Sequence, residues 1–102
     1  MTNCIFCKIK NGEIPSNFLY EDDNCFAIND INPKAKKHIL VIPKAHIESL
    51  NEVEDFELIK NMFEAIKKIN KQENINHFKT QINTGAGAGQ EVMHLHIHIL
   101  AN

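Results

Sequence analysis

The stretch Met93-His94-Leu95-His96-Ile97-His98-Ile99-Leu100 decides how this chain is interpreted. Three histidines alternate with aliphatic residues, and the side chains of a β-strand point to opposite faces with period 2. One face of the predicted strand over 93–100 therefore carries imidazole, and the other carries hydrocarbon that packs into a core. From a rise of roughly 3.3–3.4 Å per residue, successive imidazoles are expected about 6.6–6.8 Å apart, too far to bond one another directly.

A row of imidazoles on one strand face supports two uses. Neutral histidine can attack phosphorus or take a proton near pH 7, and protonated histidine can donate to a leaving group. Imidazole also binds transition metals. An affinity tag is a poor explanation, because its histidines would be consecutive and would lack the aliphatic alternation. The strand alone therefore leaves nucleophilic phosphoryl or nucleotidyl transfer and metal binding both open.

The remaining sequence predicts an α+β protein in which strands cluster in pairs around one main helix. The helix is predicted over 54–70, where apolar residues recur at i+3/i+4 spacing. That face consists of Phe56, Ile59, Met62, Phe63, Ile66 and Ile69. A short helix is predicted at 5–11, with Ile5, Phe6 and Ile9 turned inward and Gly12 ending it. The other predicted elements are a hairpin of 18–21 with 25–29, an apolar strand at 38–42 ended by Pro43, and a strand at 78–83. Residues 1–102 are expected to form a single domain with about five antiparallel strands.

Composition narrows the classes of function. The chain has 102 residues, a net charge of −2 and 43% hydrophobic residues, which gives no overall attraction to nucleic acid or anionic membranes. Its longest apolar run is residues 39–42, far short of the roughly 20 residues of a membrane helix. Residues 1–4 show no export signal, so a cytoplasmic location is expected.

Two further motifs carry chemistry. Cys4-Ile5-Phe6-Cys7 is a C-x-x-C motif, which in a chain without an export signal indicates a metal pair or a redox pair. The loop Asn83-Thr84-Gly85-Ala86-Gly87-Ala88-Gly89-Gln90 lies directly before the histidines. Its glycines would let backbone N–H groups approach a phosphate, although a flexible connection would have the same composition. His38 is predicted to be structural and His77 exposed; His46 alone would be a helix-start or packing histidine.

These motifs together resemble the histidine triad (HIT) family, and in particular its Hint branch. His94-Leu95-His96-Ile97-His98-Ile99-Leu100 matches the family's His-φ-His-φ-His-φ-φ signature, where φ is apolar. The segments 4–9, 39–47 and 83–92 are similar to the same branch and occur in the same order. The resemblance implies a five-stranded α+β protomer that pairs into a homodimer with a continuous ten-stranded sheet.

The resemblance also implies nucleotidyl transfer or hydrolysis of purine nucleotides of the AMP or GMP type, above all nucleoside phosphoramidates. By this similarity His96 is the nucleophile that forms a nucleotidyl-histidine, and His98 contacts the phosphate and leaving group. Asp30 would bind the ribose hydroxyls. The remaining substrate contacts implied are Gly89, Gln90 and Asn83 for the phosphate pocket, and Ile5, Phe6, Ile9, Ile28 and Ile31 around the base. No catalytic metal is required, because imidazoles and backbone donors supply the electrostatic stabilisation.

Cys4, Cys7, His46 and His94 also resemble the ligands that hold structural zinc in many bacterial-type members of the family. Two cysteines and two histidines suit a closed tetrahedral zinc site, and buried thiols without metal are the alternative. The chain departs from some animal relatives at Glu91, where those have a serine that donates to the leaving group. An ionised carboxylate can only accept hydrogen bonds, so efficient phosphoramidase activity does not follow from the resemblance alone.

Two alternative functions stay open at this stage. One is hydrolysis of dinucleoside polyphosphates. The other is a non-catalytic regulatory module that binds nucleotide or zinc.

Overall fold

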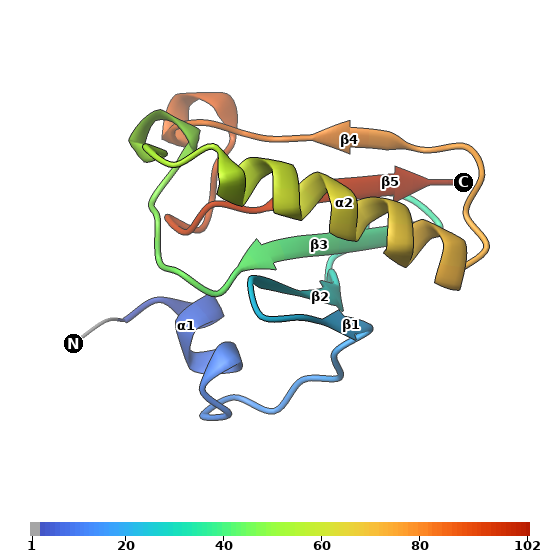
Figure 1. Ribbon diagram of the computed structural model, residues 1–102, viewed down its shortest axis with the longest axis horizontal. Helices are drawn as coiled ribbons and strands as arrows, with labels where there is room; N and C mark the ends of the chain where they lie inside the picture. Colours follow the sequence, from blue (N-terminus) through green and yellow to red (C-terminus); the bar gives the residue numbers. More distant parts are fainter. Residues whose placement is uncertain (1–2) are drawn as a thin grey trace.

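A computed structural model describes residues 3–102 and contains a five-stranded antiparallel sheet with strand order β1-β2-β3-β5-β4 (Figure 1). The helices and strands are α1 (Ile5–Lys10), β1 (Tyr20–Glu21), β2 (Cys25–Asn29), β3 (Lys37–Pro43), α2 (Glu57–Gln72), β4 (Lys79–Gln81) and β5 (Ile97–Ala101). Two short 3-10 turns lie at Leu50–Glu52 and Ala86–Ala88. The predicted α+β class, with five strands, one main helix and a short N-terminal helix, is confirmed. Within the described residues neither α-helix is long and apolar enough to cross a membrane.

The central strand β3 separates two apolar clusters, because its side chains alternate between the faces of the sheet. On one face, α2 packs over the sheet (Figure 1). That cluster includes Ile39 and Val41 of β3, Ile97 and Ile99 of β5, and Met62, Ala65, Ile66 and Ile69 of α2. The opposite face packs under α1, with Leu40 and Ile42 of β3 against Phe6, Ile9, Phe26 and Ile28. The aliphatic half of the histidine stretch thus packs into the core, as predicted, and the structure shows that this core lies under α2.

The main helix begins later than predicted, at Glu57 rather than residue 54. The Asp55 carboxylate accepts a hydrogen bond from the Glu57 backbone N–H at 3.0 Å, and this polar group satisfies the start of the helix. The helix continues to Gln72, and Asn74 follows with a positive φ of 59°, a conformation that asparagine tolerates. The predicted apolar face is wrong at its edge, because Phe56 and Phe63 are 64% and 40% exposed.

The histidine strand is also shorter than predicted, since β5 begins at Ile97 and not at residue 93. The β3–β5 ladder pairs Val41 with Ile97, and two residues further along β3 stands Pro43, which has no N–H to donate. The Leu95 N–H bonds the Ile47 carbonyl instead, at 2.7 Å. His94 and His96 therefore lie on the segment leading into β5, and only His98 lies within the ladder.

The N-terminal helix α1 ends before Gly12, whose φ of 82° suits glycine, as predicted. It buries Phe6, Cys7 and Ile9 against the sheet. Ile5 is 42% exposed, so the prediction that it faces the core is wrong.

Candidate active site and metal site

Strand register gathers three polar side chains on the α1 face of the sheet. His98 pairs with Leu40 across β3 and β5, and His38 pairs with Leu100, so the two histidines are diagonal neighbours on one face. Asp30 directly follows β2, and its backbone N–H bonds the His38 carbonyl at 2.8 Å. Residues far apart in the sequence thus meet because the strands are antiparallel neighbours.

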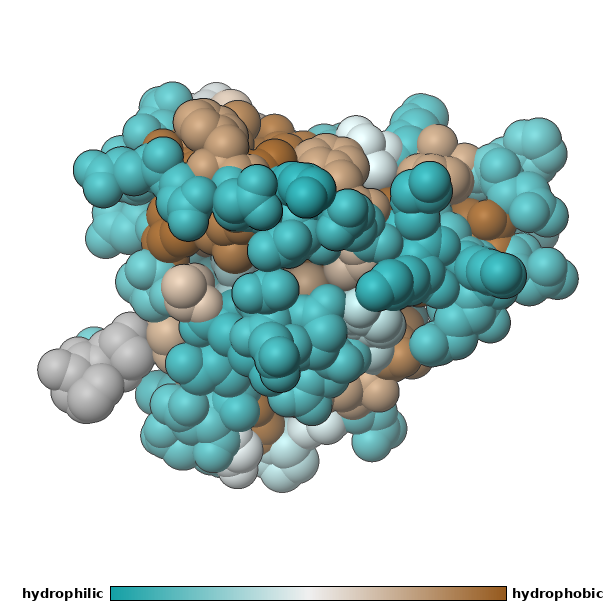
Figure 2. Space-filling view, in the orientation of Figure 1, coloured by the Kyte–Doolittle hydropathy of each residue, from teal (hydrophilic) through white to brown (hydrophobic). Residues whose placement is uncertain are grey.

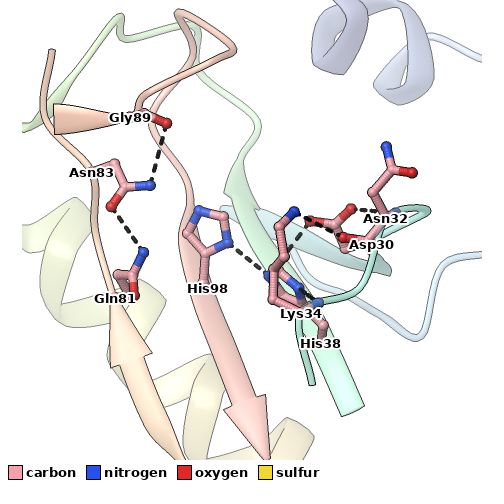
Figure 3. A network of polar contacts seen from close by, with 8 residues as sticks. All are labelled: Asp30, Asn32, Lys34, His38, Gln81, Asn83, Gly89 and His98. Carbon is pink, nitrogen blue, oxygen red and sulfur yellow. Dashed lines mark hydrogen bonds and ion pairs between the residues drawn. The ribbon is translucent and has the colours of Figure 1, made fainter. Parts of the chain in front are cut away.

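These side chains form a polar network (Figure 3). The distance from His38 Nε2 to His98 Nδ1 is 2.8 Å, and that from His38 Nε2 to Asp30 Oδ2 is 3.4 Å. His38 Nδ1 accepts a hydrogen bond from the Lys34 backbone N–H at 3.0 Å. From the sequence only a structural role is predicted for His38, whereas its ring contacts one of the triad histidines directly.

The network fixes the tautomers of both neutral rings. Because His38 accepts at Nδ1, its proton is on Nε2, from which it donates to Nδ1 of His98. His98 in turn carries its proton on Nε2. Among the described residues no group bonds this buried atom, and Figure 3 shows that nitrogen turned away from His38 toward the side of Asn83. His98 therefore holds a buried N–H that has no hydrogen-bond partner among the described residues.

Asp30, His38 and His98 are also close enough together to hold a metal. The tautomer argues against it, because the nitrogen of His38 that would face the ion carries the proton in its hydrogen bond to His98. We therefore interpret this group as a hydrogen-bonded relay.

His96 is oriented by the backbone of the triad itself. Its Nδ1 lies 2.7 Å from the carbonyl oxygen of His94, so Nδ1 carries the proton and Nε2 keeps a lone pair. Burial lowers the pKa of His96, which is 8% exposed, and this keeps the ring neutral near pH 7. The rings of His96 and His98 lie 4.9 Å apart between centroids, closer than predicted, because His96 precedes the regular pleat of β5.

His94 directs its ring away from the relay, toward the N-terminus of the chain. Its Nε2 donates to the Pro43 carbonyl at 2.8 Å, which leaves a lone pair on Nδ1. Burial lowers the pKa of His94 to about 4, and the hydrogen bond to Pro43 opposes that shift in part. The ring is fully buried and neutral, a state suited to binding a metal.

His94 belongs to a cluster of four possible metal ligands, the donor cluster of Cys4, Cys7, His46 and His94. Their ligand atoms lie within 4.8 Å of one another. From His94 Nδ1, Cys4 Sγ lies at 3.3 Å, Cys7 Sγ at 3.6 Å and His46 Nδ1 at 3.1 Å. Cys7 Sγ lies 3.3 Å from His46 Nδ1. Tetrahedral zinc bonds of about 2.3 Å to sulfur and about 2.05 Å to nitrogen imply S···N edges of about 3.5 Å and N···N edges of about 3.3 Å. These residues therefore fit a tetrahedral metal.

A cavity of about 200 Å³ opens beside the relay. It is lined by Asp30, Lys34, His38, Gln81, Asn83, Gly89, Glu91, His98 and Leu100. A second cavity of about 350 Å³ lies next to the metal ligands and is lined by Asn3, Cys4, Ile5, His46, Glu48, Glu91, Val92 and Met93. Glu91 lines both, and so stands between the relay and the metal site. Lys34 was not predicted from sequence.

The glycine-rich loop is held in place by the side chain of Gln90, which is 4% exposed. Its carbonyl oxygen accepts from the Gly85 N–H at 2.8 Å, and its amide nitrogen lies 2.6 Å from the Glu48 carbonyl and 3.0 Å from that of Val92. The Gln90 amide is thus fully engaged within the chain. Asn83 Nδ2 lies 3.4 Å from the Gly89 carbonyl, at the cavity wall. A phosphate contact from the Gln90 side chain stays a prediction and would require these bonds to open.

The five residues predicted around a base do not share one environment. Phe6, Ile9 and Ile28 are buried in the apolar cluster beneath α1. Ile5 is 42% exposed and lines the cavity beside the metal ligands, and Ile31 is 88% exposed. His77 is exposed, as predicted. The base-binding role of these residues stays a prediction.

Comparison with known proteins places this geometry in a family. Residues 3–102 match the family model described as "Scavenger mRNA decapping enzyme C-term binding". The curated protein HitA of Neisseria gonorrhoeae is 48% identical over 98% of this chain and 96% of its own length.

Three solved structures show the same fold. A histidine triad protein from Clostridium difficile is 47% identical with a TM-score of 0.95, covering 100% of this chain and 92% of its own. A HIT family hydrolase from Legionella pneumophila is 42% identical with a TM-score of 0.92, covering 98% and 93%. A histidine triad nucleotide-binding protein from Candida albicans is 35% identical with a TM-score of 0.86, covering 95% and 73%. Since residues 3–102 match the family model and relatives of this family are 47–48% identical over nearly the whole chain, the chain belongs to the histidine triad family.

Proposed function

We propose that the protein is a nucleotide hydrolase that works through a nucleotidyl-histidine intermediate, with nucleoside phosphoramidates of purines as its substrates. The observation that carries this proposal is the 2.7 Å hydrogen bond from His96 Nδ1 to the His94 carbonyl. It leaves the Nε2 lone pair of His96 as a nucleophile, and the lowered pKa keeps that lone pair unprotonated near pH 7. The similarity to a HIT family hydrolase and to a nucleotide-binding relative supports the same class.

The proposed reaction has two displacements at phosphorus. His96 Nε2 attacks the α-phosphorus, and a P–N bond to the ring forms while the bond to the leaving group breaks. The Nε2–H of His98 donates a hydrogen bond to the leaving nitrogen, which departs as an amine by taking its proton from solvent, because a neutral imidazole does not release its last N–H near pH 7. Water then attacks the same phosphorus, the P–N bond to His96 breaks, and the proton that this water loses passes to solvent. Both histidines end as they began.

The remaining residues are assigned by position. Asp30 binds the ribose hydroxyls at one wall of the cavity, and Asn83 and the backbone around Gly89 bind phosphate oxygens at the other. The backbone N–H groups of a glycine-rich segment suit this purpose. Ile5, Phe6, Ile9, Ile28 and Ile31 provide the apolar side of the base site.

We further propose that the four donors of Cys4, Cys7, His46 and His94 hold zinc. When bound, the ion supplies a structural cross-link between α1 and the segment before β5. The near-tetrahedral spacing of the donors and the neutral, lone-pair state of His94 Nδ1 support this assignment.

Intermediate trapping tests the catalytic proposal. The protein is mixed with an adenosine phosphoramidate, quenched without acid and analysed by intact mass. Wild type should gain the mass of one adenylyl group, whereas His96→Ala should show neither the adduct nor turnover above background. Comparing turnover of the phosphoramidate with that of a dinucleoside polyphosphate measures substrate preference. A wild-type protein that never forms the adduct, together with unchanged turnover in His96→Ala, would refute the mechanism.

A further inference from the structure

His94 takes part in two sites at once. Its ring nitrogen Nδ1 belongs to the donor cluster, 3.1 Å from His46 Nδ1 and 3.3 Å from Cys4 Sγ. Its backbone carbonyl accepts the hydrogen bond that orients His96, at 2.7 Å. The position of the ring and the position of the carbonyl are therefore tied through a single residue that is fully buried.

A second contact joins the same two sites. Phe6, between the two cysteines on α1, is 5% exposed and meets the ring of His94 edge-on at 5.7 Å. It meets the ring of His96 in the same manner at 5.1 Å, with an interplanar angle of 81°. The proposed nucleophile thus packs against α1, which carries Cys7 and directly follows Cys4.

The helix α1 has little stability of its own. It spans six residues, far fewer than the 12–15 that an isolated helix needs to be marginally stable in water, and no side chain caps its start. What fixes it is the burial of Phe6 and Ile9 together with the contacts of Cys4 and Cys7 at the donor cluster. A change that releases Cys4 or Cys7 from the donor cluster should therefore also loosen the packing of Phe6 against the ring of His96.

We propose that metal bound at the donor cluster positions the nucleophile, with His94 and Phe6 as the positioning residues. The inference rests on the proposed function. Coordination at Nδ1 of His94 fixes the ring of His94 and, through it, the backbone carbonyl of the same residue. That carbonyl accepts the hydrogen bond from Nδ1 of His96, so the proton of His96 stays on Nδ1 and its Nε2 faces the substrate. Cys4 and Cys7 hold Phe6 against the His96 ring. Neither His94 nor Phe6 touches the reacting atoms in this scheme.

Removing the metal should therefore slow chemistry more than it weakens binding. A misplacement of about 1 Å can cost roughly 100-fold in rate, so kcat should fall on the order of 10- to 100-fold. KM should rise by a smaller factor, since only the apolar side of the proposed base site depends on α1, whereas Asp30, Asn83 and Gly89 line a cavity that none of the four donor residues lines. All measurements belong well below the melting temperature of the metal-free protein, with circular dichroism confirming that it is folded.

The experiment compares zinc-loaded protein, chelated protein, chelated protein to which zinc is returned, and two variants. Cys7→Ser removes a donor, and Cys25→Ser is the matched control, because Cys25 is a buried cysteine of β2 outside the cluster. The readout independent of activity is the ring ¹⁵N spectrum of His96 at fixed pH, assigned by its loss in His96→Ala. Loaded wild type and Cys25→Ser should show a single Nδ1–H tautomer. Chelated protein and Cys7→Ser should show a mixture of tautomers, and added zinc should restore the single tautomer and kcat in wild type.

Two results would overturn the inference. One is a protein that binds no zinc. The other is a protein that binds zinc but keeps the same His96 spectrum and kcat after chelation. Failure of the proposed function would look different, because loaded wild type would then form no nucleotidyl adduct, while the ring spectrum would still report whether metal orders His96.

Discussion

The three histidines of the signature differ in which ring nitrogen holds the proton, and each is assigned by its hydrogen-bond partner. His94 donates from Nε2 to a carbonyl, His96 donates from Nδ1 to a carbonyl, and His98 accepts at Nδ1 from His38. These partners assign lone pairs to His94 Nδ1 and His96 Nε2, and an N–H to His98 Nε2. One repeated residue type thus offers a metal ligand, a nucleophile and a hydrogen-bond donor.

The lowered pKa of His98 predicts how stability depends on pH. Burial lowers the pKa of His98 from 6.5 to about 4, and repulsion from His96 and His38 adds to the shift. The unfolded chain binds this proton more readily than the folded chain, so stability rises with pH between about 4 and about 6.5. His98→Asn should flatten the rise in melting temperature across that range. After discounting for solvent screening, the difference corresponds to roughly 1–2 kcal/mol. His77→Asn, at an exposed histidine, should leave the wild-type profile unchanged.

The hydrogen bonds of Gln90 predict an effect on stability that its predicted role in phosphate binding does not suggest. Its amide makes three hydrogen bonds, to Gly85, Glu48 and Val92, in a buried position. Gln90→Ala would leave those backbone groups unsatisfied and should lower the free energy of unfolding by about 1–3 kcal/mol in urea denaturation. Gln81→Ala, an exposed amide, is the control. Equal stability of the two variants would show that the loop is held by something else.

The helix and strand with strong hydrophobic periodicity could be predicted from sequence, whereas the boundary of β5 and the contacts between neighbouring strands could not. The alternation in 94–100 predicted which residues of β5 face the core, and i+3/i+4 spacing predicted α2. The start of β5 escaped prediction, because it depends on Pro43 standing across the sheet, and strand pairing is not written in local sequence. His38 escaped for the same reason, since only register makes it the diagonal neighbour of His98.

The alternation in β5 can be tested through its apolar half. Ile97 is fully buried between the sheet and α2, so Ile97→Ala should lower the free energy of unfolding by about 2–4 kcal/mol through lost burial and a cavity. Ile31→Ala, at a position 88% exposed, should change it by less than about 0.5 kcal/mol. Chemical denaturation of both variants measures the difference. Similar values for the two would contradict the placement of Ile97 in the core.

At the scale of the whole molecule, the apolar surface is unevenly distributed. Figure 2 shows apolar side chains among polar ones in the upper part of one face, around α2. Phe56 and Phe63 of this helix are 64% and 40% exposed, and Phe78, just before β4, is 44% exposed. β4 is also an edge strand, with unpaired backbone groups along its outer side. Exposed phenylalanines and an open sheet edge favour association with another chain, as expected for the homodimer and ten-stranded sheet that the family resemblance implies.

Solution mass tests this association. Wild type should elute in light-scattering chromatography at twice the 11.7 kDa of one chain. Phe63→Asp should shift the mass toward a single chain, because a charge placed in an apolar interface loses its hydration without gaining a partner. Glu64→Asp, on the neighbouring exposed position of α2, should remain dimeric. A wild-type mass of one chain at all concentrations would contradict the dimer, and a dimeric Phe63→Asp would place the interface elsewhere, away from this part of α2.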